Sequence, residues 1–205
     1  ANAVDGVPVT FAVTGGTGTV TASALTVSGV ATATYTSSTT AGSGTVTATV
    51  GATSGNATVT LTAGPASKIS LTANPATISS STISESTLTA RILDPFDNLV
   101  NAGAESTQTV TFGVTSTTFG NIKTGYTSVA AIAGVATSIV ESAVTTGGTI
   151  TCTADAGALT QGTVNVTTVP FGITAPIFPL LPVRTGEQLT FTGAGGSGSF
   201  SWTFS

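Results

Sequence analysis

The chain has 205 residues, a formal net charge of −4 and only 6% charged residues, where an ordinary soluble domain has about 25%. Its four basic residues are spread along the sequence, so neither a nucleic acid nor an anionic membrane surface is an expected partner. Histidine is absent, which removes the usual general base and the commonest metal ligand, and we expect no enzymatic activity.

The pattern of side chains predicts an all-β protein. Thr and Val prevail; both are β-branched and suit a pleated strand, whereas Met is absent and Lys is scarce. Apolar residues occupy every second position, as in Val7, Val9, Phe11 and Val13, with one face of each strand buried and one in water. No apolar run approaches the 18 residues or so of a membrane-spanning helix, so we expect no membrane insertion.

Residues 1–64 contain three short blocks that recur later in the chain. They are VTFAVT from Val9, GVATATYTSS from Gly29 and GTVTATV from Gly44. We expect residues 1–64 to form an immunoglobulin-like domain that lacks its first strands, because the chain starts immediately before the first block. A chain without Met is also expected of a processed or partial polypeptide.

Residues 65–169 are predicted to be a complete immunoglobulin-like domain. The blocks recur in the same order as VTFGVT, GVATSIVESA and GTITCTA, starting at Val110, Gly134 and Gly148. The repeat period is about 100 residues, the length of one β-sandwich domain. Strands are expected before the blocks, in SKISLTANPAT and STLTARIL, and after them in GTVNVTTV. The sequence therefore predicts tandem Greek-key sandwiches in an elongated array.

Residues 170–205 differ from the repeat and are expected to supply the opening strands of a further immunoglobulin-like module. They contain TGEQLTFTGAGGSGSFSWTFS, two alternating stretches around a Gly-rich turn. Trp202 alternates with Phe200 and Phe204, which is typical of a core strand; a sugar-stacking platform is the alternative.

The order of these motifs resembles the bacterial immunoglobulin-like domains of the invasin and intimin group. The resemblance rests on PASKISLTANPATI, LTARILDPFDNLV, VTFGVT, GVAT and GTITCTA and covers about residues 1–169. The tail from Leu180 is similar to the opening of a putative-Ig or polycystic-kidney-disease-like module. The first resemblance implies rod-like tandem arrays outside the cell, as in adhesins, surface fibres and spacers of secreted enzymes, and it carries no catalytic residues.

Of the acidic residues only Asp94 and Asp97 are close in sequence, and Asn98 follows them directly. Carboxylate and amide oxygens are the ligands of calcium, which needs six to eight of them, so this loop is a candidate calcium site and the sequence indicates no other cofactor. In the alternative, Asp94 and Asn98 cap turns through nearby backbone amides and Pro95 fixes the bend.

Three further residues carry candidate chemistry. Asn56 in NAT and Asn165 in NVT match the acceptor pattern for N-linked sugar. Cys152, the single cysteine, alternates with Ile150 and Ala154, which favours a small buried hydrophobe; an exposed or intermolecular thiol is the alternative.

Together these patterns predict an extracellular or cell-surface structural protein, a segment of a stalk, fibre or filament. Its expected partners are neighbouring immunoglobulin-like domains of the same or an identical chain, and a host or glycan ligand at a distant tip. Polymerisation is one possibility: the tail of one chain would supply the strands that residues 1–64 lack in another. A cut from a longer multi-module protein explains the same ends. The alternative functions are an adhesin or carbohydrate-binding module, with Phe96, Phe119 and Tyr126 as aromatic candidates, or a spacer in a secreted hydrolase.

Overall fold

The computed structural model describes residues 4–170, 172–174 and 192–194. It divides into two compact units, the first made of Ala1–Ala66 and Leu93–Val100, the second of Ser67–Ile92 and Asn101–Ser205. Apart from one 3-10 turn, η1 (Ala104–Thr107), the regular elements in these described residues are all strands. The predicted all-β class is confirmed. The finer boundaries 1–64, 65–169 and 170–205 stay predictions.

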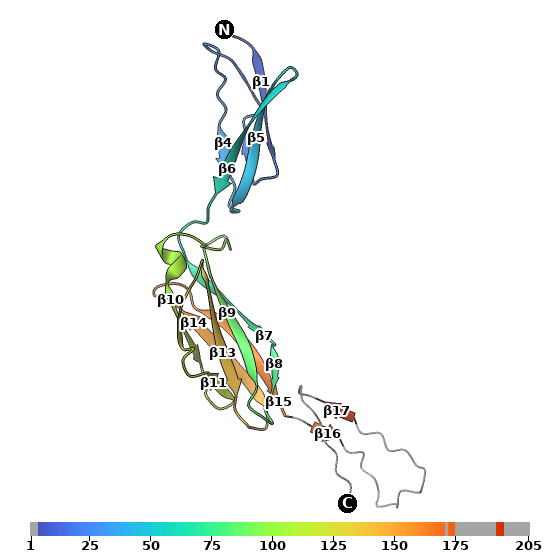
Figure 1. Cartoon of the computed structure of the whole chain (residues 1–205), viewed down its shortest axis with the longest axis vertical. Helices are drawn as coiled ribbons and strands as arrows, with labels where there is room; N and C mark the ends of the chain where they lie inside the picture. The colour runs from blue at the N-terminus through green and yellow to red at the C-terminus, as the bar shows by residue number, and fades with distance from the viewer. Residues whose placement is uncertain (1–3, 171, 175–191, 195–205) are drawn as a thin grey trace, which may run out of the picture. The chain divides into compact units, whose positions relative to one another are not determined.

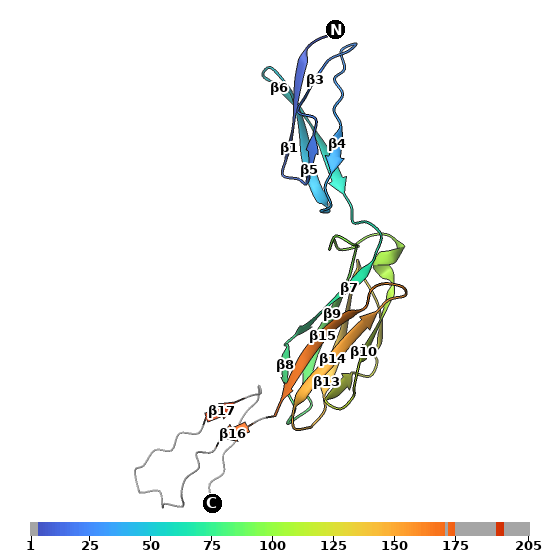
Figure 2. The same cartoon turned by 180° about the vertical axis from the view of Figure 1, so that it is seen from behind.

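The second unit is a sandwich of two sheets. Along the first sheet the order is β12 (Ser128–Ala130), β10 (Thr109–Val114), β14 (Gly148–Asp155), β15 (Gly162–Val169) and β8 (Thr77–Ser79). The second sheet has the order β11 (Gly120–Ile122), β13 (Val135–Ser142), β9 (Glu85–Leu93) and β7 (Lys68–Asn74). The second sheet faces the viewer in Figure 1 and the first in Figure 2. The pairs β12–β10, β10–β14, β14–β15, β11–β13 and β13–β9 are antiparallel, whereas β8 runs parallel to β15. This distribution of strands between two sheets is that of an immunoglobulin-like sandwich.

The core of the second unit lies between these sheets and is made by the alternating side chains that the sequence singles out. Val110 and Phe112 of β10, Val140 of β13 and Ile150 and Cys152 of β14 are each at most 3% exposed. Neighbouring Thr side chains on the same strands point to the outer face. The predicted inward orientation of Cys152 is confirmed.

The first unit contains two sheets with fewer strands. The larger has the order β3 (Ser23–Leu25), β1 (Pro8–Thr14), β5 (Gly42–Val50) and β6 (Thr53–Leu61), and the smaller pairs β2 (Gly18–Val20) with β4 (Tyr35–Ser37). These are the same relative positions that β12, β10, β14 and β15, and β11 and β13, hold in the second unit.

The register of pairing repeats between the units in the smaller sheet and differs by two residues in the larger one. Val20 pairs with Tyr35 as Ile122 pairs with Val140 in the second unit. The pairing of β1 with β5 differs: Phe11 lies opposite Ala48, whereas Phe112 lies opposite Ala154, two residues further along the equivalent strand. A shift of two residues leaves every side chain on its original face, so the inward set is preserved.

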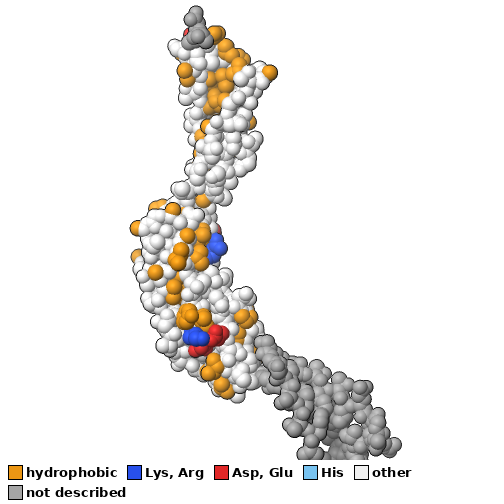
Figure 3. Space-filling model, viewed as in Figure 1, with side chains coloured by type: hydrophobic (Ala, Val, Ile, Leu, Met, Phe, Trp, Pro, Cys, Tyr) orange, Lys and Arg blue, Asp and Glu red, His pale blue; other side chains and the backbone are white. Residues whose placement is uncertain are grey.

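Apolar side chains of the first unit are less covered than those of the second. Phe11, Tyr35, Val46 and Ala48 are half-buried, although the residues at the same places in the second unit are almost fully buried. In the space-filling view, apolar side chains gather on the body that contains β1 to β6 (Figure 3). The cause is topological: the described strands of this unit include no counterparts of β7, β8 and β9.

Beyond the second sandwich, the described residues include one short pairing, between β16 (Gly172–Thr174) and β17 (Thr192–Ala194). Trp202 and the rest of the predicted third module lie outside the described residues. Among the residues described, no helix is long and apolar enough to span a bilayer.

Candidate functional site

The loop that follows β9 carries the side chains with candidate calcium chemistry, and it groups with the first unit. Asp94 is 1% exposed, and each of its carboxylate oxygens accepts two hydrogen bonds. Oδ1 accepts from the backbone N–H groups of Phe96 and Asn98, both at 2.9 Å. Oδ2 accepts from the Gly64 N–H and from Asn98 Nδ2, also at 2.9 Å. The predicted turn cap by Asp94 is therefore confirmed.

These hydrogen bonds hold Asp94 in its charged form. Burial by itself would raise the pKa of the carboxyl, but the bond from Asn98 Nδ2 and the backbone bonds from Gly64, Asn98 and Phe96 outweigh it. Together they lower the pKa from 3.8 to about 2. The ionised carboxylate thus accepts hydrogen bonds from three backbone N–H groups and from the side-chain amide of Asn98.

Asn98 extends this network to the loop between β4 and β5, which also belongs to the first unit. Its Oδ1 accepts a hydrogen bond from the Ala41 N–H at 2.8 Å, and its Nδ2 also donates to the Thr39 carbonyl at 2.7 Å. Asp97, the third predicted ligand, is exposed and has a positive φ of 69°, as its place in the turn requires. Calcium at Asp94, Asp97 and Asn98 stays a prediction; in the described part of the chain no three acidic, His or Cys side chains form a metal-binding group.

A cavity of about 400 Å³ lies beside this loop. Its walls include Leu61, Pro65 and Phe96, together with the polar side chains of Asp94 and Asn98. Phe96 is 60% exposed at its rim. Since Asp94 and Asn98 already bond to backbone groups, the cavity offers chiefly an apolar wall and small hydroxyls. Phe119 and Tyr126, the other aromatic candidates, belong to the second unit.

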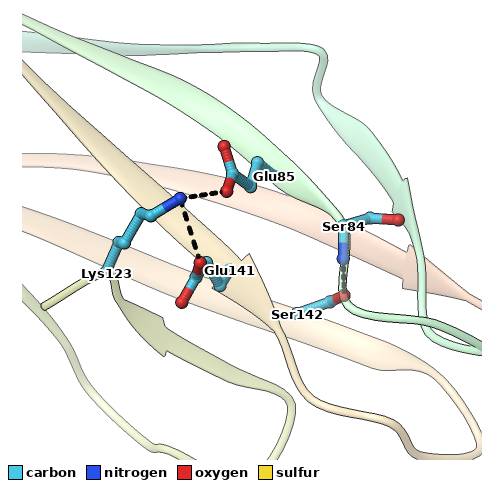
Figure 4. A network of polar contacts seen from close by, with 5 residues as sticks. All are labelled: Ser84, Glu85, Lys123, Glu141 and Ser142. Carbon is cyan, nitrogen blue, oxygen red and sulfur yellow. Dashed lines mark hydrogen bonds and ion pairs between the residues drawn. The ribbon is translucent and has the colours of Figure 1, made fainter.

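Figure 4 shows an ionic group that the sequence did not indicate. Lys123 Nζ contacts a carboxylate oxygen of Glu85 and lies 3.4 Å from Oε1 of Glu141. The hydrogen bond that Lys123 donates to Glu85 raises the pKa of Lys123, although desolvation acts in the opposite direction. The group is partly exposed and all its members are paired, so we assign it a structural role in the sheet and no role in a reaction.

Cys152 is inert in the folded chain. Its side chain is fully buried, and this burial raises the pKa of the thiol from 9.0 to about 11. Because the thiolate is the reactive form, the structure supports the interpretation of Cys152 as a small core hydrophobe.

The two glycosylation candidates lie on outer sheet faces. Asn56 of β6 and Asn165 of β15 are both exposed. Each lies opposite a Thr of the neighbouring strand, Thr47 and Thr151 respectively.

Comparisons with known proteins give structural neighbours but no family. No family model matches the sequence, and no curated protein matches it. A glycosyl hydrolase family 2 member from Bacteroides cellulosilyticus is 17% identical, with a TM-score of 0.48 over 79% of this chain and 21% of that one.

Two further solved structures are also similar. The D0-D1 domain of intimin is 26% identical, with a TM-score of 0.37 over 82% of this chain and 84% of that one. The Yersinia pseudotuberculosis adhesin InvE is 19% identical, with a TM-score of 0.41 over 78% and 48%. The chain thus spans about a fifth of the hydrolase and about half of InvE.

Proposed function

We propose that this chain is an extracellular, non-catalytic structural segment of a stalk, fibre or filament at a cell surface. The observation that carries the proposal is the internal repeat of architecture. The order β3-β1-β5-β6 recurs as β12-β10-β14-β15, and the pairing of β2 with β4 recurs in β11 and β13. Repetition of one sandwich, with its outer faces lined by Thr, suits a protein whose task is to span distance.

The charged residues support a role without catalysis. Among the described residues, Lys123 pairs with Glu85 and Glu141 on a sheet surface, and both carboxylate oxygens of Asp94 accept hydrogen bonds from N–H donors. A general acid or base needs an unoccupied position beside a substrate, and neither grouping offers one. An extracellular setting fits a low-charge, hydroxyl-rich surface. The alternative functions are an adhesin or sugar-binding module and a spacer in a hydrolase. They differ from the proposed role in the domains that adjoin this chain.

A finer form of the proposal is polymerisation by strand complementation between subunits. In the second unit, β9 pairs with β13 along Val135–Glu141, and β8 pairs with the end of β15. The equivalent edges in the first unit, on β4 and β6, have no such neighbours among the described strands. An added pair of strands with alternate apolar residues would satisfy these edges and cover Phe11 and Tyr35.

The proposed structural role is tested on native material. We expect protease treatment of intact cells to remove the chain, and electron microscopy to show extended particles that contain it. Denaturing mass measurement then separates the two forms of the proposal. A polypeptide near 19.8 kDa in a long particle supports complementation between subunits, and a much heavier polypeptide contradicts it while leaving the stalk intact. Recovery of the chain only inside the cell would contradict the structural role itself.

Complementation has a direct test in solution. A synthetic peptide of residues 67–93 contains β7, β8 and β9, the strands that have no counterparts among the described strands of the first unit. This peptide is added to the full chain. Amides of Tyr35–Ser37 and of the end of β6 are expected to gain protection from hydrogen exchange. The control peptide has Leu88, Ala90 and Ile92 replaced by Thr, which keeps the backbone donors and removes the apolar contacts. Equal protection by both peptides, or by neither, would contradict a strand-accepting face.

A further inference from the structure

Asn56 and Asn165 occupy the same place in the two units. Asn56 lies on β6 opposite Thr47 of β5, and Asn165 lies on β15 opposite Thr151 of β14. In each case the Thr hydroxyl donates a hydrogen bond to the Asn Oδ1, at 2.8 Å in the first unit and 3.0 Å in the second. One local geometry is therefore built twice, although the units differ in the number of their strands.

This geometry leaves the amide nitrogen accessible. The hydrogen bond turns Oδ1 toward the neighbouring strand, so Nδ2 points away from that strand on the outer face of the sheet. Within the part of the chain that the structure describes, neither Nδ2 donates a hydrogen bond. Both side chains are exposed, and the core lies on the opposite face.

The hydroxyl two residues further on lies on the same outer face. Thr58 follows Asn56 and Thr167 follows Asn165, and both Thr side chains are exposed. They lie opposite Thr45 and Thr149 in the ladder, so each Asn is surrounded by small uncharged side chains. The Asn-X-Thr pattern is the acceptor for N-linked sugar. The other five Asn residues of the chain are not followed by Ser or Thr at that position.

We propose that Asn56 and Asn165 are N-glycosylated, so that each sandwich carries one sugar chain at the same point on its outer sheet. The proposal requires the extracellular placement that the proposed function gives the chain. A glycan bonded to Nδ2 projects into water from the outer, Thr-bearing face of the sheet and displaces no core residue. On a surface with few charges, such chains would supply the hydration that ionic side chains supply elsewhere.

The chemistry is a glycosyl transfer from an activated glycosyl phosphate. A bond forms between Nδ2 and the anomeric carbon of the sugar, and the bond from that carbon to the phosphate oxygen breaks. The phosphate leaves with the electron pair, and the amide nitrogen gives a proton to a base of the transferase. No oxidant or reductant takes part.

The test is peptide mass mapping of the chain isolated from its own source organism. We expect peptides that contain Asn56 and Asn165 to carry a hexose-based mass increment. Amidase release in heavy-oxygen water should convert these two residues to labelled Asp. Expression of Asn56→Gln and Asn165→Gln in that organism should abolish the increment at the changed site alone.

Matched variants separate the acceptor motif from general disturbance of the strand. Thr58→Ala and Thr167→Ala keep the Asn but should abolish modification, whereas Thr58→Ser should retain it. The controls Thr60→Ala and Thr163→Ala change exposed residues of the same strands outside the motif and should leave modification unchanged. Unmodified Asn56 and Asn165 in native material, or sugar on Thr hydroxyls alone, would overturn the proposal. If the unmodified chain is still removed by protease from intact cells, glycosylation fails and the structural role stands.

Discussion

Glu85 and Glu141 lie directly opposite each other in the ladder between β9 and β13, and Lys123 contacts both carboxylates. Two like charges at opposed positions of antiparallel strands repel each other. Lys123 therefore compensates a repulsion that the register of the sheet would otherwise impose. The ammonium group of Lys123 thus favours the pairing of β9 with β13 in this register.

Replacing Lys123 by Met should lower the stability of the second unit, and more so at low ionic strength because salt screens exposed charges. Folding raises the pKa of Lys123 above 10.5, so its contribution is complete below pH 10.5 and is lost as the pH rises through the folded value. Urea unfolding at several pH values measures this. Adding Glu85→Gln to the Met variant should restore part of the loss; no restoration would contradict the compensating role.

Asp94→Asn should loosen the loop after β9, because the amide nitrogen cannot accept hydrogen bonds. Since folding lowers the pKa of Asp94 from 3.8 to about 2, its contribution is present above pH 3.8 and is lost as the pH falls toward 2. Hydrogen exchange should show lost protection at the amides of Gly64, Phe96 and Asn98 at neutral pH. The control Asp5→Asn, at an exposed position, should leave these amides protected.

Calcium should have little effect on this loop. Both carboxylate oxygens of Asp94 already accept two N–H bonds each, and a cation would have to displace these donors. We expect the same melting temperature in excess calcium and in a chelator. A rise with calcium that Asp94→Asn abolishes would instead establish the predicted metal site.

Cys152 should resist thiol reagents in the folded chain. Its side chain is fully buried and its pKa is about 11, so the thiolate is scarce and inaccessible around pH 8. Labelling should proceed at the rate of unfolding and become fast in concentrated urea. Rapid labelling without denaturant would contradict the buried position.

Phe112→Ala should destabilise the second unit by about 3–5 kcal/mol, the usual cost of removing a buried Phe. Phe11→Ala should cost the first unit less, because Phe11 is only half-buried where Phe112 is 3% exposed. Hydrogen exchange, read separately for the strands of each unit, measures both losses. Equal losses in native material would indicate that another strand pair covers Phe11 there.

The alternation of side chains was sufficient to predict the inward set, including Cys152, because a strand has only two faces. The repeated blocks likewise predicted two related sandwiches, and the Asp-Pro-Phe-Asp-Asn run predicted a capped turn. The group of Lys123 with Glu85 and Glu141 was missed, because it depends on the register between strands far apart in sequence. Alternation also shows which way Phe11 points but not what lies across from it, so its partial exposure appears only in the structure.

The parallel pairing of β8 with β15 has a mechanical consequence for the second unit. Once tension applied through Ser67 has pulled β7 away from β9, it draws β8 toward its amino end, while tension through Val169 draws β15 toward its carboxyl end. The two strands are then sheared past each other, and the hydrogen bonds between Thr77–Ser79 and Thr167–Val169 resist together rather than opening one at a time. We therefore expect this unit to yield to a pulling force abruptly, at the rupture of that short patch.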